Sequence, residues 1–164
     1  MKELLDRLGS YNIFNYLLPG VVFAAIAGSL TDYSFIQDDV LIGAFVYYFL
    51  GMIISRIGSI LIEPILKKIR FVKFSSYQDY ISASKKDELI PTLSEANNMY
   101  RTLASLFLCL LMLKGYEMMA SKLAFFKEWE VGILVIFLFV LFLMSYRKQT
   151  AYISKRVQHN LSRD

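Results

Sequence analysis

Residues 131–146, VGILVIFLFVLFLMSY, form an apolar run that contains no charged side chain. A helix needs about 20 apolar residues, within a range of roughly 17–25, to cross the hydrocarbon core of a membrane. This stretch is nearly that long, and the core of a soluble protein rarely needs a run so uniform. It therefore predicts a transmembrane helix.

Three segments closer to the N-terminus have the same character. Residues 11–30 contain no charge, and residues 40–61 contain only Arg56. A shorter apolar run at 102–113 extends to residue 119 if two charged residues lie at the membrane interface. We therefore expect an all-α membrane protein with four transmembrane helices. The chain, residues 1–164, then forms a single membrane domain with spans at about 11–30, 40–61, 102–119 and 131–146.

The composition agrees with a membrane protein. Of the 164 residues, 56% are hydrophobic and 20% are charged, against about 25% charged in a typical soluble domain. One His and one Cys exclude a zinc finger, a disulfide scaffold and most cysteine- or histidine-based catalysis. Cys109 lies in an apolar run and is expected to pack as a small hydrophobic residue. His159 lies in a polar tail and is expected to be solvated.

Lysine and arginine are distributed unevenly among the connecting segments. Residues 62–101 contain seven of them, whereas residues 31–39 contain none and have three aspartates. With Arg56 counted on the inner side, fifteen of the 18 basic residues lie on the side of the termini and the middle segment. Because positive residues stay cytoplasmic, we expect both termini, the segment 62–101 and the tail 147–164 to face the cytoplasm.

The middle segment contains the only sizeable soluble part of the chain. Residues 76–79, SYQD, form a capping-box pattern that predicts a helix running to about Leu89, with Pro91 ending it. Residues 92–95, TLSE, form a second such pattern and predict a helix that starts at Leu93 and continues into the third span. We expect a cytoplasmic helical hairpin between spans two and three, pressed against the bundle.

Polar residues and a proline interrupt the first span. Pro19 removes a backbone hydrogen bond and clashes with the carbonyl of Asn15, so a kink is expected there. Together with Asn12, this region has two interpretations. It is either a kinked packing helix whose asparagines hydrogen-bond to a neighbouring helix, or a gate at a pore mouth. The second is supported because intramembrane polar residues usually face the bundle interior. Three roles are open for Arg56: reaching the interface, pairing with Glu63, or ringing a cytoplasmic vestibule.

Small residues recur at every fourth position in the first two spans. This spacing lets helix backbones approach closely in lipid, so we expect tight helix packing or oligomer contacts. The residues are Gly20, Ala24 and Gly28 in the first span and Gly51, Ser55 and Ser59 in the second.

No catalytic constellation is present in the sequence. It has no glycine-rich phosphate loop, no HExxH, no Gly-x-Ser-x-Gly and no cysteine cluster. A soluble part of about 40 residues is also too small to build a walled active site. We therefore expect a protein that is not an enzyme and that has no cofactor and no metal site.

Basic residues with interleaved aromatics dominate the predicted cytoplasmic face. One interpretation is that they fix the topology and contact anionic lipid headgroups. The other is a site for a nucleotide or single-stranded nucleic acid, where cations follow phosphates and aromatic rings stack on bases. The candidate ligand-binding residues are Lys67, Lys68, Arg70, Lys73, Tyr77, Lys85, Lys86 and Arg101.

Residues 11–20, YNIFNYLLPG, and residues 93–101, LSEANNMYR, resemble small bacterial membrane proteins encoded beside phage-defence genes. Over most of its length the chain is similar in layout to the transmembrane effector of Hailong-type anti-phage systems. That resemblance implies an oligomeric channel held inactive by single-stranded DNA oligomers that a partner nucleotidyltransferase makes. Loss of the oligomer would open the channel and depolarise the infected cell. Kiwa-type membrane subunits and effectors gated by cyclic oligonucleotides share this design and remain alternatives.

The resemblance rests on layout, so no functional residue is carried over from it. We expect an inner-membrane channel effector of bacterial phage defence that assembles as a homo-oligomer, with a cyclic tetramer favoured because one small chain cannot enclose a wide pore. Its candidate pore or gate residues are Asn12, Asn15, Pro19 and Arg56. The alternative is a non-conducting membrane anchor or sensor that recruits a cytoplasmic defence protein.

Overall fold

The computed structural model describes residues 12–161, and the predictions for residues 1–11 and 162–164 lie outside this range. Within it, the secondary structure is helical without a β-strand, as the apolar runs predicted. The helical elements in chain order are η1 (Ile13–Leu17), α3 (Leu18–Leu30), α4 (Val40–Ile57), η2 (Gly58–Ile62), α5 (Glu63–Lys68), α6 (Tyr77–Ser84), α7 (Leu89–Ala120), α8 (Ala124–Glu128) and α9 (Glu130–Leu161).

Four continuous helices are long and apolar enough to cross a membrane, which indicates a multi-pass membrane protein. They are Ile13–Leu30, Val40–Lys68, Leu89–Ala120 and Glu130–Leu161. The last two have 32 residues each, or about 48 Å at about 1.5 Å per residue, more than a hydrocarbon core of about 30 Å. The polar half of each of these two helices is therefore expected to extend beyond the hydrocarbon core.

The first helix begins with an irregular turn. In η1 the backbone N–H of Leu18 donates to the carbonyl of Ile13, which makes a π-turn directly before Pro19. Proline has no N–H to offer to the preceding turn, and a π-turn is one of the usual ways in which a helix departs from regular geometry. The sequence predicted a kink near Asn15 and Pro19, and the structure has a π-turn there.

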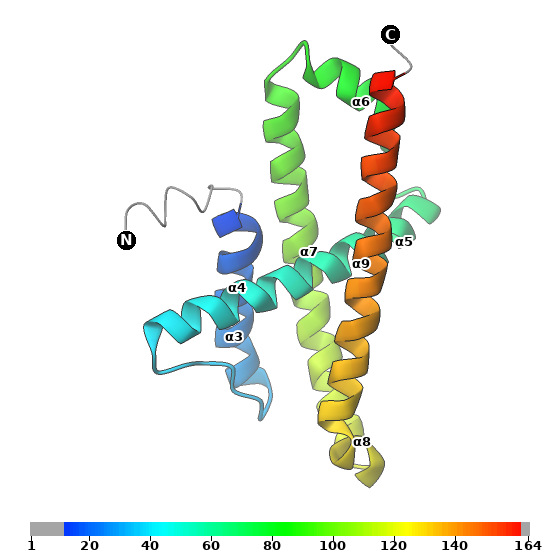
Figure 1. Cartoon of the computed structure of the whole chain (residues 1–164). Coiled ribbons are helices and arrows are strands. Elements are labelled where there is room, and N and C mark those ends of the chain that lie inside the picture. The colour runs from blue at the N-terminus through cyan, green and yellow to red at the C-terminus, as the bar shows by residue number, and fades with distance from the viewer. Residues whose placement is uncertain (1–11, 162–164) are drawn as a thin grey trace.

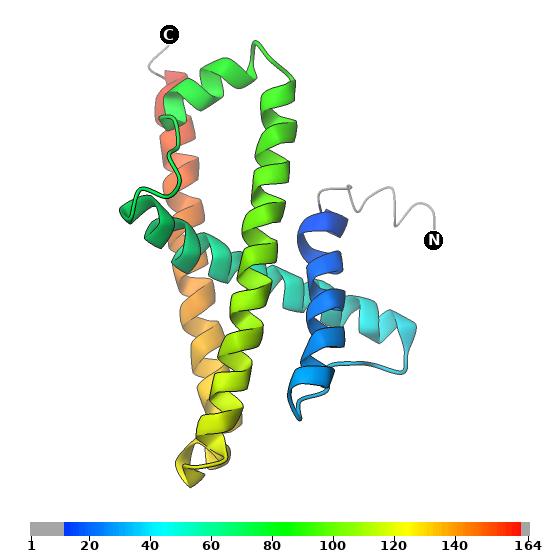
Figure 2. The same ribbon diagram turned by 180° about the vertical axis from the view of Figure 1, so that it is seen from behind.

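The second helix is longer than predicted and has an unusual direction. Asp39 caps its start by accepting a hydrogen bond from the N–H of Ile42 at 2.8 Å. The helix then continues through the π-turn η2 into α5 and ends at Lys68, beyond the predicted end at residue 61. In Figure 1, α4 crosses α3, α7 and α9 at a large angle instead of running parallel to them. Figure 2 shows the same crossing from behind.

The first two helices touch through their glycines. A Cβ atom at Gly20 would overlap the carbonyl oxygen of Tyr47, and one at Gly51 would overlap the carbonyl oxygen of Tyr16. The small-residue spacing therefore does permit a close backbone approach in this fold. Gly28 is different, because a Cβ atom there would have no neighbour within 4 Å.

The middle segment confirms one helix start and corrects two helix limits. Ser76 caps α6, with its Oγ accepting from the N–H of Asp79 at 3.1 Å. However, α6 ends at Ser84 rather than near Leu89, and α7 begins at Leu89 rather than at Leu93. Pro91 lies in the first turn of α7, where a missing N–H removes no helical hydrogen bond. It therefore starts a helix instead of ending one.

The predicted tail is helical as far as Leu161, as part of α9. The sequence from residue 133 to residue 161 contains neither Gly nor Pro, so nothing in it breaks the helix that starts in the apolar run. His159 is 7% exposed, so the prediction that it is solvated is wrong. Within α9, only Leu141 is buried besides His159.

The core lies where α3, α4 and α7 meet, with a single contribution from α9. Cys109 belongs to it, as predicted for a small hydrophobic residue. Polar side chains join the same helices: Ser105 Oγ donates to the carbonyl of Ile54 at 2.7 Å, and Thr102 Oγ1 donates to Ser55 Oγ at 3.3 Å. The buried core residues are Phe23, Ala27, Ile54, Ile57, Leu106, Cys109, Leu110 and Leu141.

Connecting segments contact the long helices near both ends of the molecule. At one end, the N–H of Asp32 donates to Glu117 Oε1 at 2.6 Å, so the loop after α3 meets the end of α7 close to α8. At the other end, α6 lies between the start of α7 and the end of α9 (Figures 1 and 2). The rings of Tyr77 and Tyr152 join α6 to α9 there, with centroids 5.8 Å apart.

Candidate functional site

A buried carboxylate collects charged side chains from three helices. The side chain of Glu63 is only 8% exposed. Its Oε1 lies 2.7 Å from Lys67 Nζ, and its Oε2 lies 2.6 Å from Arg101 Nη1. Lys148 Nζ lies 3.7 Å from Oε1. Glu63 and Lys67 belong to α5, Arg101 to α7 and Lys148 to α9, so this network joins α5, α7 and α9.

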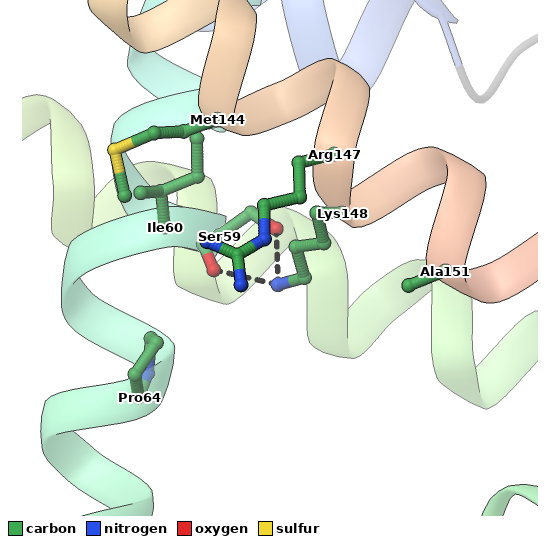
Figure 3. Close-up of a pocket in the computed structure, with 7 residues that line it drawn as sticks. All are labelled: Ser59, Ile60, Pro64, Met144, Arg147, Lys148 and Ala151. Carbon is green, nitrogen blue, oxygen red and sulfur yellow. Dashed lines mark hydrogen bonds between the residues drawn. The ribbon is translucent and has the colours of Figure 1, made fainter.

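Lys148 also anchors α9 to the π-turn η2. Its Nζ donates to the carbonyl oxygen of Ser59 at 2.6 Å and to Ser59 Oγ at 2.7 Å (Figure 3). The backbone groups of a π-turn are spaced differently from those of an α-helix, which leaves carbonyls accessible to side chains. Because three cations surround one carboxylate, the network has an excess of positive charge.

A pocket of about 360 Å³ lies beyond this network, among α6, α7 and α9. Two cations from different helices line it, Lys85 directly after α6 and Arg156 on α9, and neither forms an ion pair within residues 12–161. Tyr80 of α6 lines the same pocket. The lining residues are Tyr80, Ile81, Ser84, Lys85, Pro91 and Arg156.

The structure divides the predicted ligand-binding residues into four groups. Lys67 and Arg101 come together on Glu63, and Lys67 Nζ also lies 4.0 Å from the ring centroid of Phe74. Lys85 lines the pocket, whereas Tyr77 packs against Tyr152. The others are exposed and line neither pocket: Lys68, Arg70, Lys73 and Lys86.

The predicted pore residues pack inside the single chain. Asn15 is 2% exposed and Pro19 is buried, whereas Asn12 is half-buried. Arg56 Nη2 donates to the hydroxyl of Tyr16 at 3.2 Å, which joins α4 to η1. Of the three alternatives for Arg56, pairing with Glu63 is not observed, since Lys67, Arg101 and Lys148 surround that carboxylate.

Sequence reasoning missed Glu63 as a centre and Tyr80 as a site residue, and it counted Lys148 and Arg156 only among the basic residues of the tail. A signal for Glu63 was present, because it is the only acidic residue between Asp39 and Asp79 and directly follows an apolar run. An ionisable residue at the edge of a membrane span is expected to have a specific partner. No comparable signal marked Arg156, whose importance comes from α9 continuing past the predicted span.

No family model matches this chain, and no curated protein or solved structure matches it either.

Proposed function

We propose that this protein is a membrane effector of bacterial phage defence whose oligomer forms an ion channel gated by a cytoplasmic nucleotide or single-stranded DNA oligomer. The observation that carries the proposal is the pocket among α6, α7 and α9, where Lys85 and Arg156 stand beside Tyr80. The role in defence and a partner nucleotidyltransferase come from the family resemblance alone.

The chemistry of the pocket suits a phosphate-bearing ligand with an aromatic base. Lys85 and Arg156 supply positive charge from two helices and have no carboxylate partner within the described part of the chain. Single-stranded nucleic acids bind where cations follow the backbone and bases stack on aromatic rings. Tyr80 provides such a ring, and the volume of about 360 Å³ lies within the range of small-ligand pockets.

Occupation of the pocket can be coupled to the membrane helices. A ligand that draws Lys85 and Arg156 together changes the position of α9 relative to α6, at the start of α7, where Pro91 lines the same pocket. Helix α9 is free to respond, because in its apolar half only Leu141 is buried by the rest of the chain. Glu63 joins α7 and α9 through Arg101 and Lys148. The ligand site and the network therefore both act on α9.

The proposal places both termini and α6 in the cytoplasm of a bacterium, with the protein in the inner membrane and α6 with the start of α7 as a hairpin. The distribution of Lys and Arg supports this orientation. With four crossings, the first and third loops lie on one side of the membrane, and the middle segment lies with the tail on the other. Two contacts support this arrangement: Asp32 with Glu117 at one end, and Tyr77 with Tyr152 at the other. One chain is too small to enclose a pore, so conduction needs an oligomer, which we propose is a cyclic tetramer.

Binding of a fluorescent single-stranded oligonucleotide to the purified protein, measured by anisotropy, tests the ligand site. Lys85→Glu with Arg156→Glu should abolish binding, because the pocket then repels phosphate. Lys86→Glu with Lys155→Glu is the matched control, since it changes the net charge equally at neighbouring exposed positions outside the pocket. Equal binding by the two double variants and the wild type would refute the site.

A non-conducting anchor or sensor is the second candidate, and one observation favours it. Ser55, Thr102 and Ser105 are the polar residues buried between α4 and α7, and they bond to one another's helices instead of lining an opening. A channel needs a continuous polar path, which an anchor does not. In the anchor alternative, α6 and the end of α9 would bind a cytoplasmic defence protein.

A further inference from the structure

A second groove lies between the segment η2–α5 and the middle of α9 (Figure 3). Its volume is about 310 Å³. It shares no residue with the pocket that contains Lys85. The lining residues are Ser59, Ile60, Pro64, Met144, Arg147, Lys148 and Ala151.

The groove combines an apolar wall with two cations. Ile60, Pro64 and Met144 contribute apolar side chains, while Arg147 and Lys148 come from α9 and point towards Ser59 in Figure 3. Lys148 is already engaged by Ser59 and Glu63. Arg147 is exposed and forms no ion pair within residues 12–161, so its guanidinium can take an anion.

The position of the groove along α9 identifies the kind of anion. Arg147 is the first charged residue after the apolar run 131–146, so it lies where the hydrocarbon core of a membrane ends. Met144 lies one turn earlier, on the hydrocarbon side. Phosphates of lipid headgroups lie at the depth of Arg147, and basic pockets between membrane helices on the cytoplasmic side bind anionic lipids.

We propose that this groove binds one anionic phospholipid, with its phosphate on Arg147 and the start of an acyl chain along Ile60 and Met144. A free phosphate would leave the apolar wall uncovered, and a zwitterionic lipid would place a second cation beside Arg147 and Lys148. The bound lipid fills the space between η2 and α9. It therefore holds α9 against the end of the second helix through contacts that the chain alone does not supply.

Native mass spectrometry of the full chain in detergent tests this site, with added dioleoylphosphatidylglycerol or dioleoylphosphatidylcholine as the probe. Arg147→Gln should reduce the bound phosphatidylglycerol about fivefold, the effect of about 1 kcal/mol per cation near a lipid surface. Ala151→Leu, which narrows the groove without changing the charge, should reduce it as well. Arg70→Gln is the control, because it removes the same charge from an exposed arginine outside the groove.

Retention of phosphatidylglycerol by Arg147→Gln or by Ala151→Leu at the wild-type level would overturn the proposal. An equal loss of bound phosphatidylglycerol in Arg70→Gln would overturn the proposal too. The lipid would then be attracted by the overall positive charge of the protein and not by the groove. Inorganic phosphate should not displace the lipid. Complete displacement by inorganic phosphate would make the groove a site for free anions and contradict the assignment to a phospholipid.

Discussion

Arg101 Nη1 lies 2.6 Å from Glu63 Oε2, which joins two helices through residues 38 positions apart in the sequence. The side chain of Glu63 is 8% exposed and that of Arg101 20%. Charges removed from water to this degree stabilise a protein only when they are well paired. Because Lys148 of α9 approaches the same carboxylate, a single carboxylate contacts cations from α5, α7 and α9.

Glu63→Gln should therefore destabilise the fold. Removal of the carboxylate leaves Lys67, Arg101 and Lys148 near one another without a counter-charge. We expect a loss of about 2 kcal/mol, between the values of about 0–1 for exposed pairs and about 3–5 for fully buried ones. In thermal unfolding in detergent, this corresponds to a lower Tm by about 4–8 °C. The control Glu95→Gln removes an exposed carboxylate from α7 and should leave the Tm unchanged.

A double-mutant cycle should show that Arg101 acts through Glu63. Arg101→Gln alone should lower the Tm, because it weakens the pairing of a buried carboxylate. In the double variant Glu63→Gln with Arg101→Gln, the loss should be smaller than the sum of the two single losses. Additive losses would mean that Glu63 and Arg101 stabilise the fold independently of each other.

The glycines between the first two helices give a sharper structural test. Gly20→Ala and Gly51→Ala should each prevent the close packing of α3 on α4, at a cost of about 3 kcal/mol or more, because the new Cβ atom meets a backbone carbonyl that cannot move independently of its helix. Fluorescence-detected size-exclusion chromatography after heating measures the loss.

Gly28→Ala serves as the control for this pair. It lies on the same helix as Gly20 with no neighbour near its Cβ position. It should be neutral or stabilising by up to about 1 kcal/mol, because alanine is a better helix former than glycine. Equal behaviour of Gly20→Ala and Gly28→Ala would contradict the close crossing of α3 and α4.

The apolar spans could be predicted from sequence because the membrane imposes a minimum length on uncharged helical runs. The four apolar segments correspond to the four candidate spans, and the cap at Ser76 was also found. The limits of α6 and α7 were not, because the pattern at 92–95 also occurs within helices and Pro91 is compatible with a first turn.

The site was harder to predict, because its residues come from parts of the chain that only tertiary structure brings together. Lys67 and Arg101 were identified by charge alone, while the carboxylate that organises them was not. Arg156 contributes to the pocket because α9 continues through the polar tail, a feature that hydropathy does not report. Asn15 illustrates the converse, since a polar residue in a span is here part of the helix packing.

Labelling of single cysteines should establish the orientation. In a Cys109→Ala background, Ser34→Cys and Ser121→Cys place a thiol at one end of the molecule, and Ser75→Cys places one near the other end. All three serines are exposed. A membrane-impermeant maleimide added to intact cells should label the first two, and should label Ser75→Cys only after permeabilisation. The opposite pattern would reverse the proposed orientation.

We propose that an anionic ligand in the pocket of Lys85 and Arg156 controls conduction. Ion flux from liposomes that contain the purified protein, measured with and without a single-stranded oligonucleotide, tests this control. We expect the oligonucleotide to change the flux of the wild type and to leave that of Lys85→Glu with Arg156→Glu unchanged. Absence of flux under both conditions would contradict the channel and favour the membrane anchor.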